Sequence, residues 1–239
     1  MFVSDRAKVE PGVSLGEGVV ILGPTTIEDD VIVEDHCIIG KPSTFQSASV
    51  GKRPGQSTTF LHLDSLIDTA TVIRRGCRIG RLSTVYSGAI LHEGVVCLDY
   101  TTVGWDTEIG AGSQLMFRAQ VCSWVRVADH CRIGGFCCND SRLGRRVSMY
   151  GHLAHAYREY GGGRREDAPR LEDDVTVGFG AQIIGGVVVG CGSYVAAGSI
   201  VTKDVPPHSV VTGVNRVCSL RSWRGRLRTT RLLAGSLDR

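Results

Sequence analysis

The sequence has few aromatic residues, little net charge and no long apolar run. Phe, Trp and Tyr make up 6% of its 239 residues, and 27 basic against 24 acidic side chains leave a net charge of +3. So small a charge predicts that the molecule as a whole does not bind nucleic acid. No stretch approaches the roughly 18 apolar residues of a membrane-spanning helix, and the first residues lack the pattern of a secretory signal. We therefore expect no membrane span and a cytoplasmic location.

Cysteine pairing signals are also missing, although the chain contains nine cysteines. The number is odd, no two are spaced as Cys-x-x-Cys, and Cys137 and Cys138 are adjacent. A disulfide framework or a zinc knuckle would show regularly spaced pairs. We expect reduced thiols, which agrees with a cytoplasmic protein.

Glycine is abundant, with 31 residues, and the chain carries a repeat with a period of six. One apolar residue per repeat recurs in three runs: Val3 to Ile39, Ile73 to Ile133 (extended after a slip by Leu143 and Met149), and Leu171 to Val201. The position two residues before each of these anchors holds nothing larger than Val in the middle run. The residue after the anchor is often Gly or acidic.

This spacing predicts short strands rather than helices. A period of six keeps no single face of an α-helix, whereas short strands broken by tight turns fit it. Because residues i and i+2 share one face of a strand, the anchor and its small partner both point inward. Three such strands close one triangular coil of 18 residues, and coils stack about 4.8 Å apart. The 26 anchors predict an all-β prism of about nine coils.

The pattern resembles the hexapeptide-repeat acyltransferases, whose fold is a left-handed parallel β-helix. The resemblance covers about three quarters of the chain. It implies the left-handed winding, since general rules for crossover connections favour the opposite hand. It also implies a homotrimer, because members of the family complete their donor site with a neighbouring subunit.

Two stretches keep no six-residue register and are predicted as loop insertions, residues 40–70 and 156–170. Long loops on a rigid scaffold often carry function; tolerated surface insertions are the alternative. The tail, residues 216–239, has seven Arg and one Asp, and its Leu and Trp spacing fits a short helix. The prediction is one acyltransferase domain over residues 1–215 followed by a basic helical tail.

The segment AGSIVTKDVPPHSVVTG, residues 197–213, is similar to the closing coil of the acyltransferases. The resemblance implies that coenzyme A binds here. Ala197 and Gly198 permit the close approach of an extended ligand, and Lys203, after Thr202, supplies a cation for phosphate. Arg216 is a less secure phosphate contact, because the Pro that the family has near this point is missing. A purely structural end cap is the alternative.

The stretch from Tyr150 to His155, YGHLAH, is similar to the GHPVHH stretch of maltose- and galactoside-type sugar O-acetyltransferases, in which the first His is the base. A neutral imidazole suits removal of a proton from an acceptor, so His152 is the candidate base and His155 either orients it or is exposed. A His that caps a turn is the alternative. The resemblance also assigns oxyanion stabilisation to a backbone N–H of the turn Gly178-Phe179-Gly180, and it implies that Phe179 and Gly180 contribute to the coenzyme A site one coil before Ala197.

Asn139 stands where the middle run requires an apolar anchor. Because a buried amide must be satisfied, it either bonds to neighbouring backbone or faces the acceptor. Together with Asp140 it resembles the coil end of nucleotide-sugar N-acyltransferases, which implies binding of the acceptor. The two resemblances agree on the donor and disagree on the acceptor.

These residues predict an enzyme that transfers an acyl group, most simply acetyl, from acetyl-CoA. The acceptor is an amine or hydroxyl of a sugar, nucleotide sugar or small metabolite, and the alternative function is that of a non-catalytic β-helix scaffold. No metal is expected. The γ-class carbonic anhydrases, which share the repeat, use three His with a close His-x4-His pair, and none of the seven His here is so spaced.

Overall fold

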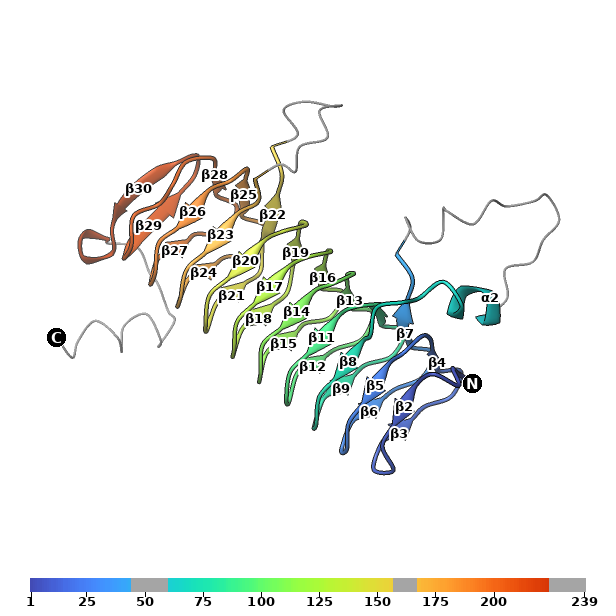
Figure 1. The fold of residues 1–239 in the computed structure, drawn as a ribbon. Coiled ribbons are helices and arrows are strands. Elements are labelled where there is room, and N and C mark those ends of the chain that lie inside the picture. Colours follow the sequence, from blue (N-terminus) through green and yellow to red (C-terminus); the bar gives the residue numbers. More distant parts are fainter. Residues whose placement is uncertain (44–59, 157–166, 224–239) are drawn as a thin grey trace.

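The computed structural model describes residues 1–43, 60–156 and 167–223. Its strands form three parallel sheets, which we name A, B and C and which enclose a prism (Figure 1). Sheet A contains β1 (Phe2–Val3), β4 (Val20–Ile21), β7 (Ile38–Lys41), β10 (Thr84–Tyr86), β13 (Thr102–Val103), β16 (Gln120–Val121), β19 (Phe136–Cys137), β22 (His152–Ala154), β25 (Gln182–Ile184) and β28 (Ile200–Val201). Sheet B contains β2 (Lys8–Val9), β5 (Thr26–Ile27), β8 (Val72–Ile73), β11 (Ile90–Leu91), β14 (Glu108–Ile109), β17 (Arg126–Val127), β20 (Arg142–Leu143), β23 (Arg170–Leu171) and β26 (Val188–Val189). Sheet C contains β3 (Ser14–Leu15), β6 (Ile32–Val33), β9 (Arg78–Ile79), β12 (Val96–Cys97), β15 (Gln114–Leu115), β18 (Arg132–Ile133), β21 (Ser148–Met149), β24 (Thr176–Val177), β27 (Tyr194–Val195), β29 (Ser209–Thr212) and β30 (Arg216–Ser219).

This arrangement confirms the predicted all-β fold of stacked hexapeptide coils. Each strand pairs in parallel with the strand one coil later, as Phe2 does with Val20. Sheet A has ten strands, so the prism has one coil more than the anchor count predicted. The reason is that the count left out three buried anchors, Cys137 of β19, Leu153 of β22 and Val211 of β29. Left-handed winding remains what the family resemblance implies.

The interior of the prism is the predicted column of anchors and small partners. Anchors such as Ile79, Leu115 and Ile183 have no exposed surface, and burying one such side chain contributes about 1.5–3 kcal/mol. Cysteines at the small positions are buried too, and burial raises the pKa of the Cys77 and Cys131 thiols to about 11. These thiols are therefore protonated filling at neutral pH.

Two corners between sheets C and A are two residues shorter than the regular ones. Four residues separate β15 from β16, but two separate β18 from β19 and β21 from β22. The short corners are Gly134-Gly135 and Tyr150-Gly151. A Cβ added to Gly135 would lie 1.9 Å from Gly151 O, and one added to Gly151 would lie 2.3 Å from Ala181 O. Only glycine fits such close backbone approach, and the two corners protrude less than their neighbours.

Both predicted insertions leave the prism at the corner between sheets A and B, one after β7 and one after β22 (Figure 1). Residues 40–41 still belong to β7, so the first insertion begins later than predicted. It contains the helix α2 (Phe60–Asp64), and Ile67 after it is buried against Val20 and Leu22. Residues 44–59 and 157–166 lie outside the described residues.

The chain continues as strand beyond the predicted domain boundary at residue 216. Left-handed backbone at Gly213 (φ 57°) and Asn215 (φ 51°) turns it back, and β30 pairs antiparallel with β29. A short 3-10 helix, η1 (Leu220–Ser222), follows. Residues 216–219, which we assigned to the helical tail, thus form the second strand of a hairpin. Most of the tail, residues 224–239, lies outside the described part of the chain, so its predicted helix stays a prediction.

Candidate active site

His152 lies on the outer face of sheet A, at the edge next to sheet C. It is the first residue of β22, is exposed, and follows directly on the short Tyr150-Gly151 corner. Its neighbours in register are Phe136 of β19 and Gln182 of β25. The imidazole therefore stands on an exposed strand between two short corners and the turn that precedes β25.

The turn that contains Phe179 and Gly180 lies one coil after His152. The His152 N–H donates to Ala181 O at 2.8 Å, and the Gly180 N–H donates to Tyr150 O at 3.4 Å. These bonds hold the turn directly against the corner from which β22 starts. The structure therefore brings the predicted base and the predicted oxyanion turn to adjacent coils at the same edge of the prism.

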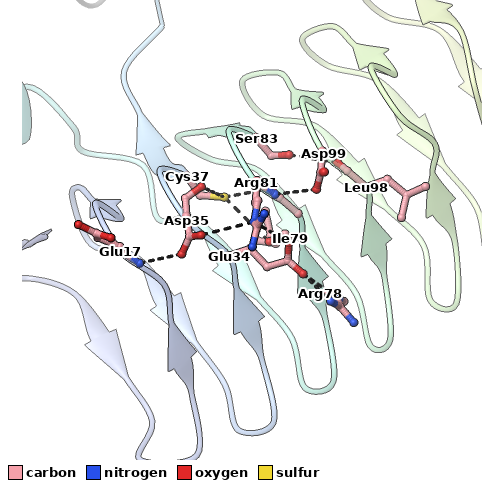
Figure 2. A network of polar contacts seen from close by, with 11 residues as sticks. Glu17, Glu34, Asp35, Cys37, Arg78, Ile79, Arg81, Ser83, Leu98 and Asp99 are labelled. Atoms are coloured by element: carbon pink, nitrogen blue, oxygen red, sulfur yellow. Dashed lines mark hydrogen bonds and ion pairs between the residues drawn. The ribbon is translucent and has the colours of Figure 1, made fainter.

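Two corners between sheets C and A in the N-terminal half, those at Glu17 and Arg81, are capped by an aspartate of the next coil (Figure 2). Asp35 Oδ1 accepts the Glu17 N–H at 3.0 Å, and Asp99 Oδ1 accepts the Arg81 N–H at 2.9 Å. Each carboxylate thereby satisfies a backbone donor that the strand ladder leaves unpaired.

Ala197 occupies the place equivalent to Asp35 and Asp99, but its side chain has no acceptor. Within the described residues, the N–H of Phe179 one coil earlier donates to no protein oxygen. The backbone is close here, since a Cβ on Gly178 would lie 2.6 Å from Ala197 N. Ala197 itself is exposed, and so is the Phe179 ring, at 81%. The corner thus offers a free backbone N–H beside a small side chain.

The predicted donor residues fall into two groups. The first group, Phe179, Gly180, Ala197 and Gly198, lies at the corners between sheets C and A. The Gly198 N–H donates to Phe179 O at 3.0 Å, which holds these two corners against each other. Thr202 and Lys203 lie at the other end of β28, at the corner between sheets A and B, and Lys203 is exposed. Asn215 accepts the Thr202 N–H and donates to Thr202 Oγ1, both at 2.8 Å. These bonds bring exposed Arg216, the next residue, to the same end of the prism.

Asn139 is not at an anchor position. The short corner before β19 shifts the register, so Cys137 is the buried anchor and Asn139 lies in the following turn. Its Oδ1 accepts the Ser123 N–H at 3.0 Å, a bond to neighbouring backbone, and contact of Asn139 with an acceptor stays a prediction. Asp140 has left-handed backbone (φ 61°) and donates its N–H to Ser123 O. Both residues lie at the corner between sheets A and B.

His155 is partly buried and follows the end of β22, where the second insertion begins. The three-residue strand therefore separates the two histidines, with His152 at the sheet C edge and His155 at the sheet B edge. Asn139 and Asp140 occupy the corner one coil before His155. The predicted acceptor residues and His155 gather on one edge of sheet A, and His152 with the oxyanion turn on the other.

Sequence reasoning missed the two short corners and the place of Phe136 beside His152. Their only signal in the sequence is the slip between Ile133 and Leu143. In the described residues, no helix is long and apolar enough to cross a bilayer. Likewise, no group of three or more His, Cys, Asp or Glu side chains in that part could hold a metal ion.

Comparison with known proteins identifies the repeat. Residues 170–203 match the family model described as the hexapeptide repeat of succinyl-transferase. The bifunctional protein GlmU of Herminiimonas arsenicoxydans is 27% identical over 213 residues, which cover 89% of this chain and 40% of the relative. GlmU of Geobacillus thermodenitrificans is 28% identical over 185 residues, covering 71% and 40%. The chain thus spans about two fifths of the length of these relatives.

Two solved structures are also similar. The UDP-N-acetylglucosamine acyltransferase of Campylobacter jejuni has a TM-score of 0.35 and 19% identity, over 98% of this chain and 81% of that one. A mutant GDP-perosamine N-acetyl transferase of Caulobacter crescentus, in complex with CoA and GDP-perosamine, has a TM-score of 0.33 and 22% identity, over 58% and 52%. The family-model match over residues 170–203 and the stacked coils of the structure agree with the hexapeptide repeat that the sequence predicted. The succinyl-transferase repeat supports acyl transfer as this chain's general class of function.

Proposed function

We propose that the protein is an acyltransferase that moves an acyl group, most simply acetyl, from coenzyme A to an amine or hydroxyl. The acceptor is a sugar, a nucleotide sugar or a small metabolite. His152 is the general base, the Phe179 N–H stabilises the oxyanion, and Ala197, Gly198 and Lys203 line the donor site. The working unit is a cytoplasmic homotrimer, in which a neighbouring subunit completes that site.

The reaction needs one base and one oxyanion donor. His152 Nε2 or Nδ1 takes the proton of the acceptor as its oxygen or nitrogen attacks the thioester carbonyl carbon. The carbonyl electrons move to oxygen, where the Phe179 N–H donates a hydrogen bond. The intermediate then collapses by breaking the carbon–sulfur bond, and the imidazolium returns its proton to the leaving thiolate. No cysteine is acylated, which agrees with the buried, protonated thiols.

The observation that carries this proposal is the uncapped corner. At two corners of this edge Asp35 and Asp99 accept the N–H of Glu17 and of Arg81, whereas within the described residues the N–H of Phe179 has no protein acceptor. Exposed His152 lies one coil away, which gives a base and an oxyanion donor at one edge.

Release of free thiol tests the proposal. Purified protein is incubated with acetyl-CoA and a panel of amino sugars, nucleotide sugars and small amines or alcohols, and free thiol is measured with a chromogenic disulfide. We expect acceptor-dependent release that the His152→Ala variant loses. Acetyl-CoA that neither binds nor turns over in the wild type would favour the non-catalytic scaffold instead.

A further inference from the structure

Two arginines point outward in direct register on sheet B. Arg142 of β20 pairs with Arg170 of β23, and below them Arg126 of β17 pairs with Arg142. Neighbouring strands lie about 4.8 Å apart, and like charges directly opposite each other destabilise a sheet. The fold has no need of charge here, since Val72 and Ile90 take the equivalent outward positions in earlier coils.

Arg126 has acidic partners that compensate its charge, whereas Arg142 and Arg170 have none among the described residues. Arg126 lies 3.7 Å from Glu108 Oε2 and 3.7 Å from Asp106 Oδ2. Arg142 and Arg170 are exposed, and neither has an acidic partner within the described residues. Arg145, exposed at the next corner, also lacks one there. Positive charge is therefore concentrated around a pair of guanidinium groups that have no acidic partner among residues 1–43, 60–156 and 167–223.

We propose that Arg142 and Arg170 form a binding site for a diphosphate group. A guanidinium is a planar fork that binds phosphate oxygens in pairs, and two forks on adjacent strands present one such donor set to each of two linked phosphates. The rigid ladder fixes the two side-chain origins, so the site is formed before the ligand arrives. It lies on a different sheet from His152 and is independent of the proposed acyl transfer.

Calorimetric titration of the full chain with inorganic pyrophosphate at low ionic strength tests the site. We expect saturable binding that weakens about tenfold in Arg142→Gln and in Arg170→Gln, the size of one lost charge-assisted contact, and disappears in the double variant. The control is Arg74→Gln, because Arg74 is already paired with Glu28 at 2.5 Å. That variant should bind like the wild type. All these side chains are solvent-accessible, and a thermal melt checks each fold.

Four results would overturn the inference. They are no binding of pyrophosphate by the wild type, equal weakening in the Arg74→Gln control, equal affinity for orthophosphate, and binding of single-stranded DNA with none of pyrophosphate. The third would indicate a single-phosphate site, and the fourth a nucleic-acid surface. Since no acyl donor is present, failure here leaves the proposed transferase activity untouched, and failure of thiol release leaves this site untouched.

Discussion

Restoring the missing cap should switch off the proposed oxyanion donor. In Ala197→Asp the new carboxylate takes the place that Asp35 and Asp99 take elsewhere, where the N–H to oxygen contacts are 3.0 and 2.9 Å. It should accept the Phe179 N–H in the same way. We expect kcat to fall by about 10²- to 10³-fold, the usual effect of losing one oxyanion donor. The free energy of unfolding should rise by about 0.5–1.5 kcal/mol, because a backbone donor gains a partner.

Two control variants separate this effect from others. Ala197→Leu adds bulk without an acceptor, so it should raise the KM for the acyl donor more than it lowers kcat. Asp99→Ala removes an existing cap far from the site, so it should lower stability by about 1 kcal/mol and leave kcat unchanged. Steady-state kinetics and urea unfolding measure both quantities. If Ala197→Asp gains stability and still keeps kcat within about threefold of the wild type, the Phe179 N–H is not the oxyanion donor.

Further predictions concern the base, the assembly, the phosphate contact and the thiols. His152→Ala should lower kcat by about 10²- to 10⁴-fold while coenzyme A still binds; near-normal turnover would exclude His152 as the base, and His155→Ala should do less. Sedimentation should give a trimer, and an active monomer of 25.7 kDa would contradict it. Lys203→Ala should cost about 1 kcal/mol or less in donor binding, with an effect that shrinks as salt rises. A buried thiol such as Cys77 ionises at pH 9.0 when unfolded but at about 11 when folded, so stability should fall as pH rises from 9 to 11, and less so in Cys77→Ala.

The six-residue repeat made the buried core predictable from the sequence. It did not predict the positions at which a corner is shorter than usual. A period of six specifies which side chains point inward, so the buried anchors from Ile21 to Val201 follow from counting. Counting fails where a corner loses two residues, because the register of everything downstream then depends on locating the loss. Asn139 was assigned to an anchor position for this reason. The strand after residue 216 was missed because it pairs through backbone bonds, for which Arg216 and Ser219 give no periodic signal.

The sequence predicted only part of the candidate site. His152 and the turn at Phe179 were found by resemblance, and the structure places them on adjacent coils. The missing acceptor for the Phe179 N–H could not be predicted from the residues around Phe179. Where such a cap exists, the accepting carboxylate belongs to a residue 18 positions later, on the next coil. The register of Arg142 with Arg170 was likewise hidden, since the second insertion lies between them.

Departures from the regular coil are concentrated in the C-terminal half of the prism. Within the described residues, all ion pairs but one join residues between 6 and 126, where acidic and basic side chains of successive coils neutralise each other. Beyond residue 126 the chain has two short corners, an uncapped turn and uncompensated arginines. The short corners lack two residues that regular corners have, and Arg142 and Arg170 lack the acidic partners that Arg126 has in Asp106 and Glu108. The proposed function would account for this concentration, because His152, the turn at Phe179 and the arginine pair all lie in these coils.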